Sequence, residues 1–154
     1  MASAVENKLS ELGIVLTKPA APVANYVPFV RTGNLLSVSG QICLDAGKLV
    51  AKGQLGGGVS VEDGQKAARA CAVNILAQVK VALGDLDKVV RVVKLTGFVN
   101  SVPGFTDGPK VMNGASDLMV AVFGDKGRHS RSTIGVAALP QDAAMEVEGL
   151  FEVS

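Results

Sequence analysis

The chain has 154 residues, of which 48% are hydrophobic and 19% charged, and its formal net charge is +1. This balance is typical of one globular domain with its own core and excludes an intrinsically disordered chain. The sequence contains no tryptophan, one tyrosine and five phenylalanines. Because nucleic-acid-binding proteins usually combine a basic surplus with stacking aromatic residues, the composition argues against RNA or DNA as a partner.

The chain shows no sign of a membrane segment or a metal motif. It contains no run of about 18 apolar residues, so no membrane span and no membrane partner are expected. The opening stretch MASAVENKLSEL lacks the basic and continuous apolar regions of a signal peptide. Cys43 and Cys71 match no metal-ligand or redox spacing, and we expect two buried free thiols. These features predict a cytoplasmic protein.

Residues 1–23 are predicted to form an N-terminal helix and an extended lead-in. The stretch ENKLSELGIVL is amphipathic, and Gly13 is a natural helix end. Prolines in TKPAAPVANYVP then favour extended backbone. The following FVRTGNLLSVSGQICL predicts a β-hairpin, because Gly33 and Asn34 both tolerate the positive φ of a tight turn.

A short strand at GKLVAKG, two long helices and three further strands are expected after the hairpin. Ser60, followed three residues later by Asp63, resembles an N-terminal capping box, and apolar residues recur at helical spacing until Gly84. The β-branched stretch VVRVVKLTGFVNS predicts a strand. The remaining expected elements are a helix over about residues 106–123 and strands over about residues 131–138 and 145–153.

This order predicts one α+β domain, residues 1–154, with a mixed β-sheet and two helices packed on one face. The second face of such a sheet would stay uncovered. Large exposed apolar surfaces usually mark interfaces, so we expect oligomerisation through that face.

The last two strands each place charge on one face. Because side chains alternate along a strand, Arg131 and Ile134 lie on different faces of the first of these strands, and we expect the Ile134 face to be the core face. On the last strand, Glu146 likewise lies on the face away from the apolar residues. If LPQDAA closes a hairpin, Arg131 lies near Glu152 and roughly 20 Å from Glu146. The two residues could then share a site only if one came from a neighbouring subunit.

Two interpretations of these charges stay open. Arg131 could be a solvated strand-end residue or a partner of Glu152, and Glu146 could lie on a solvent-facing edge. In the functional interpretation, Arg131 clamps a carboxylate with two hydrogen bonds and a glutamate facing it orients or activates water. His129 is the only histidine. A lone histidine cannot build a His-rich zinc site, and a loop position is favoured over one that tunes Arg131 or touches a ligand.

Three stretches resemble one known family. RSTIGVAALPQDAAMEVEG resembles the C-terminal signature of the RidA/YjgF family, also labelled L-PSP endoribonuclease-like. NYVPFVRTGNLLSVSGQI resembles the family's tyrosine-containing loop and Ser-Gly-Gln-Ile strand. EDGQKAARACAVNILAQVKVALGDLDKVVRVVKLTGFV resembles its helix and the strand that follows. The resemblance covers residues 24–153 and implies a chorismate-mutase-like α+β fold in homotrimers with clefts between adjacent subunits.

The resemblance also implies an activity and a set of site residues. Family members hydrolyse reactive enamines and imines, such as 2-aminoacrylate and 2-imino acids, to 2-keto acids and ammonia. This chain would then be a hydrolase similar to 2-iminobutanoate/2-iminopropanoate deaminases, acting on small carboxylates without a metal or other cofactor. Arg131 matches the arginine that clamps the substrate carboxylate, and Glu146 matches the glutamate that positions the attacking water. The residues matching pocket-lining or substrate-binding positions are Tyr26, Ser39, Gly40 and Thr133, the last standing where many members have cysteine.

One stretch departs from the family pattern. GFTDGPKVMNGASDLMVAVFG is longer than its equivalent in typical family deaminases and lacks their asparagine-then-aromatic pocket residues, although Asn113 and Ser116 lie nearby. This departure indicates a divergent subgroup with a reshaped pocket mouth. A non-catalytic trimer that binds small carboxylates or keto acids therefore stays open as an alternative. Ribonuclease activity ranks lower, because charge and aromatic content give no nucleic-acid footprint.

Overall fold

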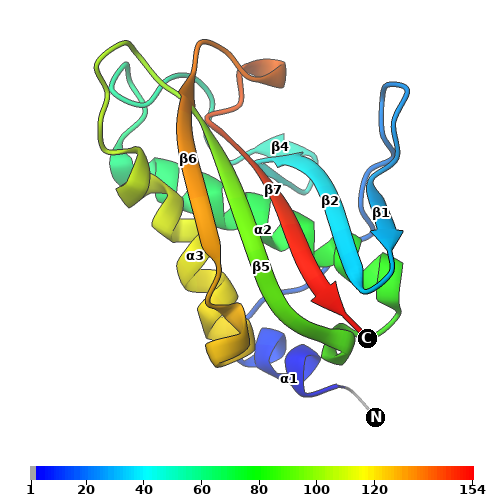
Figure 1. Ribbon diagram of the computed structural model, residues 1–154. Helices are drawn as coiled ribbons and strands as arrows, with labels where there is room; N and C mark the ends of the chain where they lie inside the picture. Colours follow the sequence, from blue (N-terminus) through cyan, green and yellow to red (C-terminus); the bar gives the residue numbers. More distant parts are fainter. Residues whose placement is uncertain (1–2) are drawn as a thin grey trace.

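The computed structural model describes residues 3–154, so residues 1 and 2 of the predicted N-terminal segment lie outside the described part. A five-stranded sheet has the strand order β1-β2-β7-β5-β6, and β3 and β4 form a separate ribbon (Figure 1). In chain order the elements are α1 (Ala4–Glu11), β1 (Phe29–Thr32), β2 (Leu35–Ile42), β3 (Leu44–Asp45), β4 (Lys48–Leu49), α2 (Val61–Leu83), η1 (Leu86–Lys88), β5 (Val89–Asn100), α3 (Gly108–Phe123), η2 (Gly124–Gly127), β6 (Ser130–Val136), η3 (Pro140–Asp142) and β7 (Met145–Val153).

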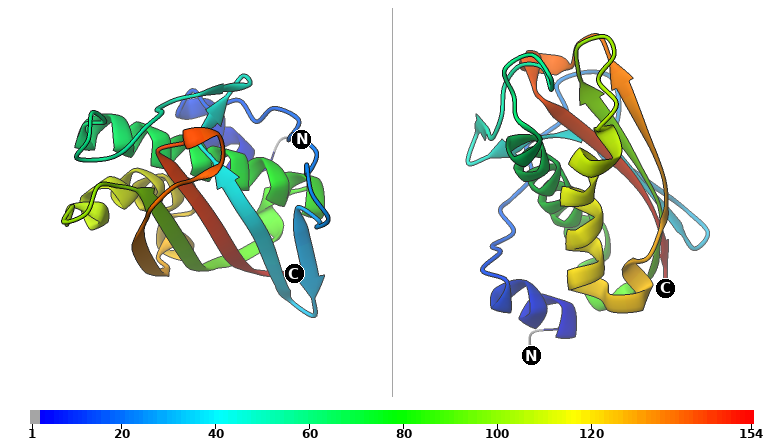
Figure 2. Two further views of the ribbon diagram at one scale, coloured as in Figure 1. Left: turned by 90° about the horizontal axis from the view of Figure 1, so that it is seen from above. Right: turned by 90° about the vertical axis from the view of Figure 1, so that its left-hand side faces the viewer.

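Helices α2 and α3 pack on the same face of the five-stranded sheet, as the right view of Figure 2 shows. The predicted α+β architecture with both long helices on one face is therefore confirmed. We call the opposite side the open face, because no described helix covers it. Strand register places Val30, Leu35, Phe98, Ile134 and Glu146 on this open face.

The sequence signals at both ends of α2 are confirmed. Ser60 caps the helix by accepting a hydrogen bond from the Asp63 backbone N–H at 3.1 Å. Gly84 ends it in the left-handed conformation that glycine adopts without strain. The apolar stripe between these caps is buried against the sheet and α3, and it includes Ala68, Cys71, Ala72, Ile75, Leu76, Val79 and Leu83.

Helix α3 begins at Gly108, two residues later than predicted, with Pro109 in its first turn. Proline fits this position because its missing N–H would have no helical partner there. Gly114 lies where α3 approaches α2, since a Cβ atom at this position would overlap the backbone carbonyl of Gln65. Proline and glycine usually weaken a helix, but Pro109 and Gly114 each have a structural reason for their place in α3.

The hairpin considered for the last two strands does not form. Strand β6 pairs in parallel with β5, and β5 lies between β6 and β7. A strand–helix–strand unit normally returns its second strand parallel to the first, and β5-α3-β6 follows this rule. The connection from β6 to β7 therefore crosses the end of β5. Within it, Gln141 and Asp142 both have positive φ. Strand β6 itself ends at Val136 and not at residue 138.

The predicted core face is correct for β7 and wrong for β6. On β7, the residues Met145, Val147, Phe151 and Val153 are all buried against the helices. On β6, Ile134 is 50% exposed on the open face, whereas Arg131 and Thr133 face α3. Strand β6 is at the sheet edge, where a long polar side chain can reach past the core to the helix surface.

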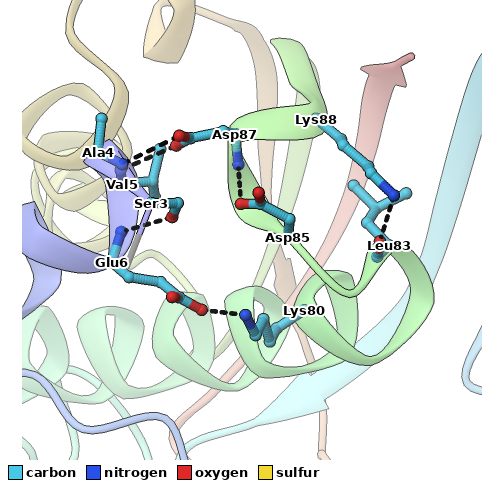
Figure 3. A network of polar contacts seen from close by, with 9 residues as sticks. All are labelled: Ser3, Ala4, Val5, Glu6, Lys80, Leu83, Asp85, Asp87 and Lys88. Atoms are coloured by element: carbon cyan, nitrogen blue, oxygen red, sulfur yellow. Dashed lines mark hydrogen bonds and ion pairs between the residues drawn. The ribbon is translucent and has the colours of Figure 1, made fainter. Parts of the chain in front are cut away.

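Helix α1 is anchored by polar contacts to Asp87 and to Lys80 of α2 (Figure 3). The Asp87 carboxylate accepts hydrogen bonds from the backbone N–H groups of Ala4 and Val5 at 3.0 and 2.9 Å. These bonds hold the pKa of Asp87 below its ordinary value. Glu6 forms an ion pair with Lys80 of α2. The predicted N-terminal helix is thus present and tied to the α2–β5 region.

Cys43 and Cys71 are both buried and free, as predicted. Burial raises the pKa of the Cys71 thiol, so this side chain behaves as a small core residue. Among residues 3–154, no helix is both long and apolar enough to cross a lipid bilayer.

Candidate functional site

Arg131 is braced by helix α3. Its Nη1 group donates hydrogen bonds to Asn113 Oδ1 at 2.8 Å and to Ser116 Oγ at 3.1 Å. Its Nη2 group donates to the Pro109 carbonyl oxygen at 3.0 Å. The side chain is half-buried between β6 and the first half of α3. It is therefore neither a freely solvated strand-end arginine nor a partner of Glu152.

The three bonds leave part of the guanidinium available. Arginine has five N–H donors, and the two on Nη1 and one on Nη2 are used within the described chain. The Nε–H and the second Nη2–H have no partner in residues 3–154. Two such donors on a planar cation can bind both oxygens of one carboxylate.

Thr133 lies two residues further along the same face of β6. Its hydroxyl is buried and has no hydrogen-bond partner among residues 3–154. Gly108 at the start of α3 leaves space for it, because a Cβ there would lie 3.3 Å from Thr133 Cγ2. A buried hydroxyl without a partner costs free energy, so Thr133 is available to a ligand that would donate to it or accept from it.

Glu146 lies on the open face of β7, between Ile42 of β2 and Phe98 of β5. Burial raises the pKa of its carboxyl, and the nearby charge of Glu148 raises it further. A carboxylate whose charge is disfavoured in this way binds a proton more readily than an exposed one. This property suits a group that accepts a proton from water during a reaction.

Gly40 makes room for Glu146. A Cβ atom at Gly40 would overlap the Glu146 carboxylate and would lie 3.0 and 3.2 Å from its Cδ and Cγ atoms. The preceding residue, Ser39, donates from Oγ to the Val27 carbonyl at 2.8 Å. Ser39 thereby fixes the loop that carries Tyr26, whose side chain is 51% exposed.

The structure does not bring Arg131 and Glu146 together within one chain. Leu95 of β5 pairs with Arg131 on one side and with Gly149 of β7 on the other. Gly149 is therefore two strands from Arg131, and it is three residues from Glu146 along β7. At about 3.3 Å per residue and 4.8 Å per strand, their Cα atoms are roughly 14 Å apart. Their side chains also point to opposite faces of the sheet. The predicted residues therefore form two groups, one around Arg131 and one around Glu146.

Three residues of the Arg131 group were noted in the sequence but not included in the predicted site. Asn113 and Ser116 are spaced i, i+3 on α3, so their side chains lie on the same side of the helix. His129 precedes β6 in a loop, as expected, but its ring is half-buried and its Nε2 lies 2.9 Å from Ser116 Oγ. The i, i+3 spacing of Asn113 and Ser116 was the available signal. In a strand–helix–strand unit with parallel strands, the second strand runs beside the helix, so side chains on that side of α3 can reach β6.

Three hollows in the described part of the structure lie apart from both groups, one of them lined by Asp45, Lys66 and Asn74. A hollow of about 400 Å³ between α1, α2 and α3 includes Arg69 and Asp117, and one of about 560 Å³ at the end of β6 includes Ser101 and Phe105. Neither Arg131 nor Glu146 lines these hollows. Within residues 3–154, no three His, Cys, Asp or Glu side chains are arranged to hold a metal ion.

The fold and the two groups define an α+β protein with a helix-braced arginine at the sheet edge and a half-buried glutamate on the open face. The model of one family, described as "YjgF/chorismate mutase-like, putative endoribonuclease", matches residues 6–152. The chain belongs to this family, as its sequence motifs indicate.

Three relatives cover nearly the whole chain. "Protein TCP17" of Trypanosoma cruzi is 51% identical over 151 residues, which are 97% of this chain and 94% of that protein. The crystal structure of Atu1372 from Agrobacterium tumefaciens, titled as of unknown function, is 49% identical with a TM-score of 0.92 and covers 98% and 93% of the two chains. A structure from Shewanella oneidensis titled a putative endoribonuclease is 34% identical with a TM-score of 0.94 and covers 98% and 100%. This pattern is consistent with a divergent, TCP17-like subgroup of the family.

Proposed function

We propose that this protein hydrolyses reactive enamines and 2-imino acids to 2-keto acids and ammonia, at clefts between the subunits of a homotrimer. The main support for this proposal is the fixed orientation of the Arg131 guanidinium. Helix α3 fixes its guanidinium with three hydrogen bonds and leaves two N–H donors for a ligand. Such a group recognises a planar carboxylate, which every 2-imino acid carries.

Glu146 supplies the second requirement, a group that activates water. An imine conjugated to a carboxylate is already electrophilic, so hydrolysis needs a positioned water and a place for its proton. With its pKa raised by burial and by Glu148, Glu146 is suited to accept that proton. Water then adds to the imine carbon, and the nitrogen leaves as ammonia after protonation. Arg131 holds the carboxylate throughout, so the reacting carbon stays in one place.

Two subunits are needed because one chain keeps Arg131 and Glu146 on opposite faces of its sheet. A second copy that packs against the open face can bring its own Arg131 edge toward Glu146. The open face has the apolar side chains that an interface requires, including Val30, Leu35 and Ile134, which are 53%, 37% and 50% exposed. Tyr26 and Ser39 would line the same cleft from the Glu146 side.

The first test compares wild type with Arg131→Ala on freshly generated 2-imino acids of several side-chain sizes, by measuring 2-keto acid release. Losing two hydrogen bonds from a charged group, each about 1.5–3 kcal/mol, should lower kcat/KM by roughly 100-fold or more. Arg69→Ala is the matched control, since Arg69 is exposed on α2 and belongs to neither group. If the wild type gives only the spontaneous rate with every substrate, the deaminase proposal fails.

A non-catalytic carboxylate-binding trimer is the second candidate. The arrangement of Arg131 supports it, because all three hydrogen bonds that fix the guanidinium within the described chain come from α3 and none needs Glu146. In that case Arg131→Ala would abolish binding of pyruvate, while the wild type would bind pyruvate without accelerating imine hydrolysis. The endoribonuclease activity named in the family description has weaker support here, given a net charge of +1 and one tyrosine.

A further inference from the structure

The contacts of His129 distinguish between the two tautomers of its neutral ring. Its Nδ1 lies 2.6 Å from the Gly127 carbonyl oxygen, which can only accept a hydrogen bond. When the imidazole is neutral, its single ring proton is therefore on Nδ1, and Nε2 is an acceptor. Nε2 lies 2.9 Å from Ser116 Oγ, so the Ser116 hydroxyl donates its proton to His129.

Ser116 is consequently engaged on both sides. Its hydroxyl proton goes to His129 Nε2, and its oxygen accepts from Arg131 Nη1 at 3.1 Å. The bonds form one directed chain, in which Arg131 donates to Ser116, Ser116 donates to His129 and His129 donates to Gly127. Hydrogen bonds that run in one direction polarise and strengthen each other.

We propose that His129 and Ser116 are positioning residues that fix the Arg131 guanidinium, so that its Nε–H and second Nη2–H bind both oxygens of a ligand carboxylate. The proposal deepens the function given above and rests on it for the ligand class. Without His129, the Ser116 hydroxyl can turn to the helix carbonyl four residues earlier, as serines in helices do. The acceptor for Arg131 would then lose its fixed orientation.

A nucleophilic role for Ser116 fits the contacts less well, although a serine bonded to an oriented histidine is a familiar catalytic pair. The Arg131 N–H occupies a lone pair of Oγ, the atom that would have to attack. Ser116 also lies within α3, half-buried. The arrangement therefore serves Arg131 and not an attack by serine.

The test compares four full-length variants with the wild type and uses a fifth, Arg131→Lys, only to assign the Arg131 signals. Ser116→Ala removes the acceptor for Arg131, and His129→Leu removes the acceptor for Ser116 while filling similar space. His129→Gln is the conservative variant, because its side-chain oxygen can take the place of Nε2. Ser10→Ala, on the exposed surface of α1, is the control. Nitrogen-15 NMR of the arginine side chains, with Arg131 assigned by Arg131→Lys, reports whether its Nη groups rotate.

We expect separate Arg131 Nη signals in the wild type, in Ser10→Ala and in His129→Gln, and averaged signals in Ser116→Ala and His129→Leu. In kinetics, the two disruptive variants should raise KM about 5- to 10-fold with kcat within about 2-fold, as expected for weakened ground-state binding. Arg131 signals in Ser116→Ala and His129→Leu that match the wild type would overturn the proposal. Because this spectroscopic result needs no turnover, an inactive wild type with the expected signals would refute the deaminase function and leave the positioning role intact.

Discussion

A methyl group added at Gly40 is the smallest change that should displace Glu146. The backbone at Gly40 does not have the positive φ that would exclude a side chain. All three atoms nearest to the added Cβ belong to the Glu146 side chain, namely Oε1, Cδ and Cγ. Gly40→Ala therefore leaves the backbone in place and forces the glutamate into another rotamer.

The expected cost follows from what has to move. Overpacking a well-packed region costs about 1–3 kcal/mol, and a flexible side chain that can swing aside belongs at the lower end. We expect Gly40→Ala to lower the free energy of unfolding by about 1 kcal/mol. Activity should fall much more, because a misplacement of about 1 Å at a reacting group can cost roughly 100-fold in rate. The assays are denaturant unfolding and kcat/KM for 2-imino acid hydrolysis.

A double-mutant cycle with Glu146→Ala tests the reasoning. Glu146→Ala removes all three atoms that the new methyl group would meet. In that background, Gly40→Ala should be nearly neutral for both stability and activity, which is strong non-additivity. Equal destabilisation by Gly40→Ala with and without the Glu146 side chain would show that the clash is elsewhere and would refute the argument.

Three further predictions concern pH and packing. The folded state raises the pKa of Glu146, so the stability that this carboxyl group contributes is fully present below its unfolded pKa and is lost as pH rises through its folded pKa. Denaturant unfolding should therefore show Glu146→Gln to be more stable than wild type at pH 7 but not near pH 4. The pKa of Asp87 is lowered, so the stability that this carboxylate contributes is present above its unfolded pKa and is lost as pH falls through its folded pKa. In Asp87→Asn the amide hydrogens of Ala4 and Val5 should exchange with solvent faster at pH 7 (Figure 3). An unchanged exchange rate would contradict the anchoring role. Gly114→Ala places a methyl group against the backbone of α2, which cannot swing aside, and should cost about 3 kcal/mol by thermal unfolding; a change below about 1 kcal/mol would show that the helices can separate there.

The helices and most strands could be predicted because their signals are local. Ser60 and Gly84 carry the caps of α2 in their own chemistry, and Gly33 with Asn34 marks the hairpin turn, where Thr32 pairs with Leu35. The alternation in β7 also predicted its buried face correctly, because that strand lies in the middle of the sheet and one side must face the helices.

The position of β6 could not be read from its own residues. Its alternation gives two faces but does not say which of them the helices cover, and Ile134 suggested the wrong one. Strand β6 is at the sheet edge, so burial does not force its apolar side inward. The order of β5, α3 and β6 contained the better signal, since such a unit normally gives parallel neighbours. That pairing also brings Arg131 to α3 and so to Asn113.

The corrected pairing makes the case for a shared site stronger than the hairpin did. In a hairpin, Arg131 and Glu146 would have been separated by distance along neighbouring strands, which a bend or a register shift could reduce. In the observed sheet they lie on opposite faces, and no register shift of an even number of residues changes the face of a side chain. A register shift of one residue would move Arg131 to the open face, but Arg131 would then lose the three bonds that it makes to α3. A ligand held by Arg131 can therefore meet a Glu146 carboxylate only when that carboxylate belongs to another copy of the chain. Mixed assemblies of Arg131→Ala and Glu146→Ala subunits should then recover part of the activity that each variant lacks alone, whereas a site built within one chain would give no recovery.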